Sequence, residues 1–475
     1  MRHLAIPCFF SIILPLHAQT SEHSERKLGE AVITARPNIN ALDIRAKSGV
    51  VQTVNMKLLV NKPMIDMSMA LQGSVPGLVV INRGELGEKP QIRIRGNSSL
   101  LRQWYFVQCG ANDPVGRQPN LPDSVMNVLL ELVLTHEVGH TLGLEHNFLG
   151  SSHFSIDSLR NDAFLTRNGI TTTIMDYVRC NYALRPTDKA SLRNRIARLG
   201  VYDRWAIEWA YRLFPGKDAA ERAANREQWA KKCRADSLLA FRDGLDVMAQ
   251  AEDLGNDHLA VNAQGMENLR LLCADSTNWI WRDSVERSRF CDRQEGLVEH
   301  YYDMLRQVMA HFIGKHIAPS ADSLIFVIEP PAVAHRTLNF IEKHLWHPPY
   351  WLFDAERGRM LGINMKDKRD KFCEEVFEIW KQALMEIDSW DCSQSPRLTS
   401  VEMLRSAYTA LFVSQTGTTK GKELLQDFRE KHLKLLLNLN GEEATSISAP
   451  LLVEVNWQMS KVCVPTNKMP LRGRL

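Results

Sequence analysis

The stretch THEVGHTLGLEHNF, residues 135–148, holds three histidines and two glutamates, Glu137 and Glu145, within eleven residues. Positions i and i+4 of a helix project from one face, so His136 and His140 can bind one metal ion together. Gly143 can adopt a positive φ and end the helix, and the reversed chain can then return His146 as a third ligand. Catalytic zinc sites have three protein ligands and one open position. The spacing therefore predicts a zinc site.

Glu137 follows the first histidine directly but projects in another direction, because adjacent helical residues are rotated by about 100°. It points toward the place of a bound water and is the candidate general base. The alternative is a buried helix whose histidines are satisfied by hydrogen bonds. Gly143 and His146 at their fixed offsets favour the metal site over that alternative.

Length and composition indicate an ordinary globular protein. The chain has 475 residues, enough for more than one domain, and 44% of them are hydrophobic and 24% charged. The formal charge is only +3, and no basic run with interleaved aromatic residues occurs. Nucleic acid and anionic membrane surfaces are therefore not indicated as partners.

Residues 1–18 have the pattern of a secretory signal peptide. Arg2 and His3 precede the apolar run LAIPCFFSIILPL, and Ala18 offers a small residue for cleavage. The run is too short to span a bilayer, and a buried core helix is the alternative. We expect an exported protein, in the periplasm, at the outer-membrane surface or outside the cell, without a transmembrane segment after signal removal.

Nine cysteines become eight when the signal is removed. An even number in an exported chain permits disulfides, and buried free thiols are the equal alternative. The pairing cannot be read from the sequence. No CxxC spacing occurs, which argues against a thiolate metal cluster.

Residues 28–100 contain short strand-like stretches separated by Gly- and Pro-bearing turns, among them GLVVI and QIRIR. Together LGEAVITARP, ALQGSVPGLVV and PQIRIRGNSSL resemble part of the plug domain of SusC-type TonB-dependent outer-membrane receptors. The resemblance implies a small β-rich fragment and a possible association with the envelope. The barrel of such receptors does not follow, which argues against a nutrient receptor.

From residue 124 onward the pattern is helical. SVMNVLLELVLTHEVGHT, residues 124–141, is apolar nearly all round before its first histidine, which predicts a buried central helix. Apolar residues at helical spacing predict further helices over 296–314 and 371–387, and Thr399 followed by Glu402 predicts a capping box. The C-terminal half is therefore expected to be an α-helical domain.

The segment TTTIMDYVRCNY, residues 171–182, follows the histidines by about 30 residues and contains Met175 and Tyr177. With the extended histidine motif it resembles the metzincin metallopeptidases. That resemblance implies an α+β catalytic core in which Met175 lies beneath the zinc in a methionine turn without binding it. It also implies that Tyr177 approaches the metal or the oxyanion. A simple core role for both residues is the alternative.

The HEVGHTLGLEHN motif, with GVYDRWAIEWAYR and HPPYWLFD further on, resembles a family of bacterial zinc-dependent metalloproteases found in Bacteroidetes-type bacteria. The similarity covers roughly residues 101–460. Metzincins place a twisted sheet before the zinc helix, and here only QWYFVQCG, expected as one strand, would remain of it. The upper sheet is therefore expected to be truncated, and the helix over 124–141 to expose an apolar patch.

The sequence thus predicts a signal peptide (1–18), a plug-like fragment (28–100), a metzincin-like catalytic domain (101–215) and an α-helical domain (216–475). The expected activity is zinc-dependent hydrolysis of peptide bonds in a protein or peptide substrate, with Zn²⁺ as cofactor. Glu137 would act as base and Tyr177 would assist. The alternative is a catalytically weak or inactive zincin remnant fused to a plug-like envelope binding module.

Overall fold

The computed structural model describes residues 98–462, apart from 234, 277–278, 281–286, 318–325, 348, 390–397 and 415–420, together with five short strands before residue 98. Three strands form an antiparallel sheet, β1 (Ser11–Ile13), β2 (Glu30–Thr34) and β3 (Val51–Asn55). Two more pair antiparallel, β4 (Leu78–Ile81) and β5 (Gln91–Ile94), with Leu78 opposite Ile94.

The strands predicted at GLVVI and QIRIR are confirmed by β4 and β5. The segments between the five strands lie outside the described residues. The signal peptide and the plug-like fragment fall largely on those segments and stay predictions.

The chain divides into two compact units. The first unit comprises Met1–Cys109, Pro114–Asn181 and Asp188–Asp243, and the second comprises Gly110–Asp113, Tyr182–Thr187 and Gly244–Leu475. The histidine motif lies in the first unit.

In the first unit, α3 (Ser98–Cys109) occupies the position where one strand was expected, so that prediction is wrong. Leu101, Tyr105 and Cys109 recur every fourth residue and are at most 1% exposed, which is the burial pattern of a helix. Within the described residues of 98–243, the one pairing of extended chain is an isolated bridge between Cys180 and Ile196. The described residues of 98–243 therefore contain no strand of the expected truncated upper sheet.

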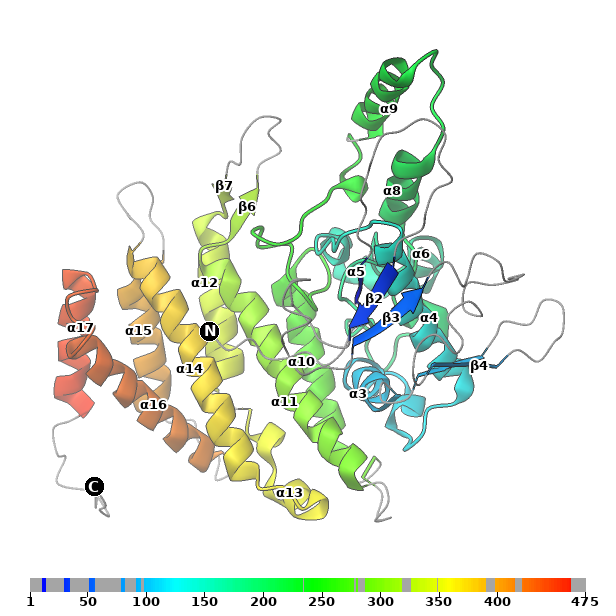
Figure 1. The fold of residues 1–475 in the computed structure, drawn as a ribbon. Helices are drawn as coiled ribbons and strands as arrows, with labels where there is room; N and C mark the ends of the chain where they lie inside the picture. Colours follow the sequence, from blue (N-terminus) through cyan, green and yellow to red (C-terminus); the bar gives the residue numbers. More distant parts are fainter. Residues whose placement is uncertain are drawn as a thin grey trace. The chain divides into compact units, whose positions relative to one another are not determined.

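The buried central helix is confirmed as α4 (Asp123–Thr141). Leu129, Leu132 and Val133 are at most 7% exposed, so the expectation of an apolar patch on this helix is wrong. Helix α3 packs against α4 and supplies part of its cover. Both helices are drawn in the cyan range of Figure 1.

Further helices and loops lie before and after α4 in the first unit. The helix η1 (Pro114–Arg117) precedes α4. After α4 come η2 (Gly150–His153), α5 (Ile156–Leu159), α6 (Asp162–Asn168), α7 (Leu192–Arg195), α8 (Val201–Tyr211), α9 (Ala219–Cys233) and η3 (Ser237–Leu239). Long irregular stretches between these helices carry residues of the histidine site.

Among its described residues, the second unit is mainly helical and contains one antiparallel pair of strands. Its longer helices are α10 (His258–Ala274), α11 (Arg287–Met309), α12 (Pro331–Ile341), α14 (Met365–Ser389), α16 (Lys422–Asn440) and α17 (Ala449–Val462). Shorter elements are η6 (Ala310–Phe312), β6 (Lys315–Ile317), β7 (Phe326–Ile328), η7 (Glu342–Trp346), η8 (Tyr350–Phe353), α13 (Ala355–Leu361), α15 (Ser400–Tyr408) and η10 (Thr409–Val413).

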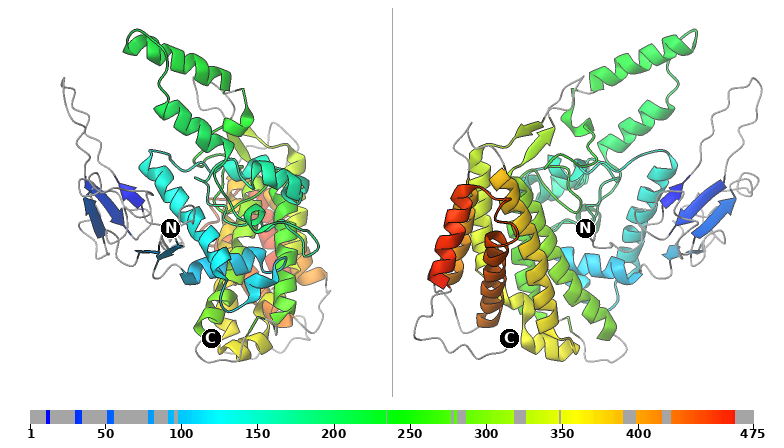
Figure 2. Two further views of the ribbon diagram at one scale, coloured as in Figure 1. Left: turned by 90° about the vertical axis from the view of Figure 1, so that its right-hand side faces the viewer. Right: turned by 60° about the vertical axis from the view of Figure 1, so that its left-hand side comes forward.

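Packing in the second unit runs from helix to helix: α10 contacts α11, α11 contacts α14, α14 contacts α16, and α16 contacts α17. Figure 2 shows these helices side by side in green, yellow and red. Their predicted faces are confirmed, because Leu297, Met304 and Val308 of α11 and Phe372 and Trp380 of α14 are at most 1% exposed.

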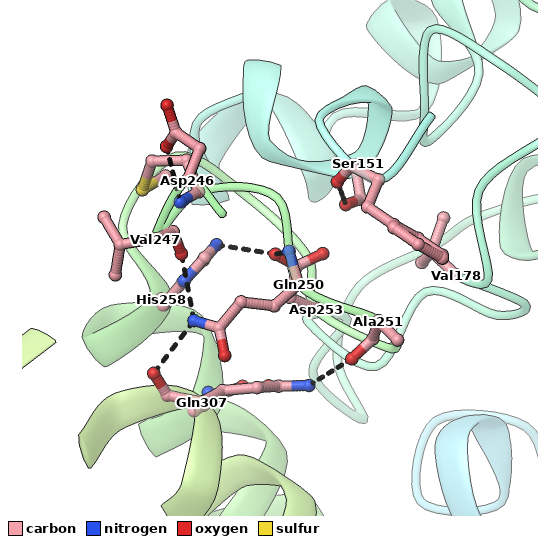
Figure 3. Close-up of polar contacts among 12 residues, drawn as sticks. Ser151, Val178, Asp246, Val247, Gln250, Ala251, Asp253, His258 and Gln307 are labelled. Carbon is pink, nitrogen blue, oxygen red and sulfur yellow. Dashed lines mark hydrogen bonds and ion pairs between the residues drawn. The ribbon is translucent and has the colours of Figure 1, made fainter. Parts of the chain in front are cut away.

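A buried polar network holds the loop that precedes α10 (Figure 3). His258 lies 3.1 Å from a carboxylate oxygen of Asp253. The side chain of Gln250 donates to the main-chain oxygens of Val247 and Gln307. These contacts satisfy polar groups that would otherwise be costly to bury.

Two further observations bear on the sequence predictions. Among the described helices, none is both long and apolar enough to cross a membrane. Cys109, Cys273 and Cys373 are buried free thiols, which is the second of the two alternatives for the cysteines, and Cys233 is a half-buried free thiol.

Candidate metal centre

The three motif histidines converge on one point. His136 and His140 project from the last turns of α4, and His146 returns to them after Gly143, whose φ of +84° turns the chain back. Nε2 of His146 lies 3.3 Å from Nε2 of His136 and 3.1 Å from Nε2 of His140. Their ligand atoms all lie within 4.8 Å of one another, and they form the only such group found among the described residues.

These distances match a tetrahedral zinc site. Two nitrogen ligands at about 2.0–2.1 Å from one tetrahedral ion lie about 3.3 Å apart. If all three Nε2 atoms are unprotonated, they cannot hydrogen-bond to one another, because none of them has a proton to donate. A shared cation explains their convergence, whereas histidines satisfied within a buried helix would point to separate partners.

The other ring nitrogen of two of the ligands is fixed by the main chain. Nδ1 of His136 lies 2.8 Å from the carbonyl oxygen of Ile174, and Nδ1 of His140 lies 2.9 Å from that of Leu144. A carbonyl can only accept, so each Nδ1 carries the proton and each Nε2 keeps its lone pair. This arrangement fixes the tautomer that a metal ligand requires.

Electrostatics also favour neutral imidazoles at this site. Burial, followed by the nearby His140, lowers the pKa of His136 to about 3. Burial and His140 likewise lower the pKa of His146 to about 4. Metal ligands must be deprotonated, so the site is prepared for a cation at neutral pH.

Glu137 is buried beside these ligands and is 7% exposed. Neither of its carboxylate oxygens has a hydrogen-bond partner among the described residues. Burial raises the pKa of this carboxyl to about 8. A buried carboxylate without a partner is costly unless a cation or a water accompanies it. The residue that the sequence singled out as the base is therefore a buried carboxyl group next to the metal ligands, with no hydrogen-bond partner among the described residues. A cation held by the histidines would favour its ionised form.

Met175 and Tyr177 both lie close to the three histidines, and the roles that the resemblance implies for them stay predictions. Met175 is fully buried beneath α4, and a Cβ added at Gly139 would lie 2.3 Å from its sulfur. Gly139 therefore allows the methionine to approach the helix between the two helical ligands. The ring of Tyr177 lies 4.6 Å from the ring of His146 and 5.8 Å from that of His136, between ring centroids.

Two buried polar residues that the sequence did not single out, Asp203 and Asn147, hold this turn. Asp203, from α8, accepts from the hydroxyl of Thr173 at 2.5 Å and from the main-chain N–H of Ile174 at 2.8 Å. Asn147 donates its main-chain N–H to the carbonyl of Met175 at 3.1 Å. The side chain of Asn147 also bonds the main chain of Ala240 and Arg242.

Their sequence signals were present but weak. Asn147 closes the HEVGHTLGLEHN motif, and Asp203 lies within GVYDRWAIEWAYR. Both stretches contribute to the family resemblance, yet nothing in their spacing says that these side chains meet the methionine turn. That contact depends on long-range folding.

A comparison with known families agrees with the geometry. A family model described as Met-zincin matches residues 118–415 of the chain. The match includes the three histidines, Glu137 and Met175, and it extends through much of the second unit. No curated protein and no solved structure matches the chain.

Proposed function

The chain belongs to the Met-zincin family, whose members use zinc, and from this premise we propose that it is a zinc-dependent metalloendopeptidase. One observation carries the proposal: three Nε2 atoms converge beside the buried carboxyl group of Glu137, which has no hydrogen-bond partner among the described residues. A merely structural zinc site would be closed by a fourth protein ligand. Among the described residues the convergent group has three.

The proposed roles follow from the positions of the side chains. His136, His140 and His146 would hold the ion, with their tautomers set by the main chain. When bound, zinc supplies Lewis-acid chemistry that lowers the pKa of water and polarises a carbonyl. Glu137 accepts a proton from the attacking water and passes it to the leaving amine.

Tyr177 is assigned a supporting role. Its ring packs against those of His146 and Phe148, which holds the phenol at the edge of the ligand cluster. From there its hydroxyl can donate to the substrate oxygen as negative charge develops on it. Met175 forms the floor of the site and takes no part in proton transfer.

The substrate is a protein or peptide. We further propose that the chain is exported and acts in the periplasm, at the outer-membrane surface or outside the cell, as its N-terminal residues suggest. An association with the envelope through residues 28–100, and an origin in a Bacteroidetes-type bacterium, belong to the same proposal.

The test is to purify the mature chain, measure its zinc content and assay cleavage of casein with and without a chelator. The proposal expects about one zinc per chain and cleavage that chelation abolishes and added zinc restores. Cleavage that persists after complete removal of the metal would contradict it.

The second candidate function is a zincin remnant with little or no activity, fused to an envelope binding module. It is favoured by one observation: within the described residues of 98–243 no strand pair is available as a substrate-binding sheet edge. Stoichiometric zinc without any casein cleavage would support this candidate.

A further inference from the structure

We propose that Asp203 is a positioning residue of the metal centre, acting on His136 through the methionine turn. Asp203 lies in the first turn of α8, far along the chain from the histidines, and is 1% exposed. This inference rests on the proposed zinc site and adds to it a residue that lies outside the motif.

Every contact of the Asp203 carboxylate points toward the turn or its own helix start. One oxygen accepts from the hydroxyl of Thr173 at 2.5 Å. The other accepts from the main-chain N–H groups of Ile174 and Gly200, both at 2.8 Å. Three donors around two oxygens suit a carboxylate, which can only accept, and no other side chain of similar size offers the same set.

Asp203 and the first ligand bond to the main chain of the same residue, Ile174, on its two sides. The N–H of Ile174 donates to Asp203, and the carbonyl of Ile174 accepts from Nδ1 of His136 at 2.8 Å. The hydroxyl of Thr173, while donating to Asp203, accepts from the N–H of Met175 at 3.0 Å. Asp203 thus fixes both the main chain that sets the tautomer of His136 and the methionine beneath the ion.

Loss of this carboxylate would leave a hydroxyl and two main-chain N–H groups without their acceptor in a buried place. The turn would relax, and Ile174 would no longer hold its carbonyl at the distance that orients His136. Removal of groups that orient metal ligands typically weakens metal affinity by about 10–100-fold. A residue that only stabilised the fold would lower the melting temperature and leave the metal geometry unchanged.

The experiment compares wild type with Asp203→Asn and Asp203→Ala in the full chain. Zinc affinity is measured by competition with a chromophoric chelator, and the ligand field by the absorption spectrum of the cobalt-substituted protein. The matched control is Glu208→Gln on the same helix, because Glu208 is an exposed carboxylate whose contact is an ion pair with Arg212. We expect weaker zinc binding, by tenfold or more, and a changed cobalt spectrum in the Asp203 variants alone.

A second pair of variants keeps the test open if Asp203→Ala fails to fold. Thr173→Val removes the hydroxyl that links Asp203 to Met175, and Thr173→Ser restores it. We expect Val to weaken zinc binding and shift the cobalt spectrum, and Ser to rescue both. Unchanged affinity and spectrum in folded Asp203 and Thr173 variants would overturn the inference while leaving the zinc site intact. A wild-type chain that binds no zinc would overturn the proposed function, and this inference with it.

Discussion

At the scale of single residues, Glu137 separates metal binding from hydrolysis. Among the described residues, its carboxyl group is buried without a hydrogen-bond partner and is not a member of the group of possible metal ligands. We therefore expect Glu137→Ala to retain zinc and to lose casein hydrolysis by about 10²–10⁴-fold, the usual contribution of a general base. Zinc content and kcat measured on the same preparation check this. Loss of the metal together with activity would show that Glu137 has been assigned the wrong role.

His146 is the residue whose removal should affect the metal itself. It is the one of the three histidines from outside α4, and its Nε2 lies 3.3 Å from Nε2 of His136 and 3.1 Å from Nε2 of His140. We expect His146→Ala to weaken zinc binding markedly, because two helical histidines alone leave the ion under-coordinated. Equilibrium dialysis against buffered zinc measures the affinity. An unchanged affinity would require another third ligand.

The histidines could be predicted from the sequence because their spacing is local. The i and i+4 positions of one helix and a glycine turn fix the geometry within eleven residues. Asp203 and Asn147 could not be predicted in the same way. Their partners, Thr173, Ile174 and Met175, lie some 30 residues away in the chain, and only the folded loops bring them together.

At the scale of secondary-structure elements, helices with one apolar face were predictable and the element before α4 was not. Burial along α11 and α14 follows the predicted stripes, and the capping box of Thr399 and Glu402 is present. QWYFVQCG has apolar residues on both alternating faces, so its pattern fits a buried strand as well as a buried helix. In the structure this segment is part of the helix α3, which buries Leu101, Tyr105 and Cys109 on one face.

Helix α16 carries a buried histidine that should make stability depend on pH. His432 is fully buried, its Nε2 lies 2.9 Å from Oε1 of Gln458 on α17, and burial lowers its pKa to about 4. Because the folded pKa lies below the unfolded value of 6.5, the unfolded chain gains a proton first as the pH falls. The stability of the helical unit is therefore complete above pH 6.5 and decreases from there toward pH 4.

A variant isolates this contribution. His432→Gln keeps an N–H donor for Gln458 but cannot be protonated, so its stability should depend less on pH. Between pH 7.5 and pH 5, wild type should lose about 2 kcal/mol more of its free energy of unfolding than the variant. Urea denaturation at both pH values measures the difference. Equal losses in both proteins would exclude His432 as the titrating group.

At the scale of the whole molecule, the metal site and most of the long helices belong to two different compact units, and the family match covers parts of both. Every residue assigned to the site, including Asp203, belongs to the first unit. The family match nevertheless runs through residue 415, so the helical unit is part of what defines the family. A sequence motif locates the zinc ligands, but it carries no information on what the helical unit contributes to substrate binding.

The first unit contains all three predicted histidine ligands, but the apolar side of α4 is covered in part by the helix α3 where a strand was expected. Metzincins, which the motif resembles, bind an extended substrate along the edge of a sheet, where main-chain hydrogen bonds add to affinity. Here α3 packs on α4 in the segment where such a strand was expected. The apolar side of α4 is covered, so the fold is not left incomplete, but the described residues of this segment offer a substrate no strand to pair with.

We therefore expect catalysis to be limited by substrate binding rather than by the metal. A chimera that carries an upstream metzincin sheet before residue 118 should have a higher kcat/KM for casein-derived peptides, mainly through a lower KM. Zinc affinity should be equal in the two proteins, because the ligands and the methionine turn are unchanged. Both must be monomeric and fully zinc-loaded for the comparison. Equal kcat/KM values would show that α3 or another part of this chain already supplies the missing substrate contacts.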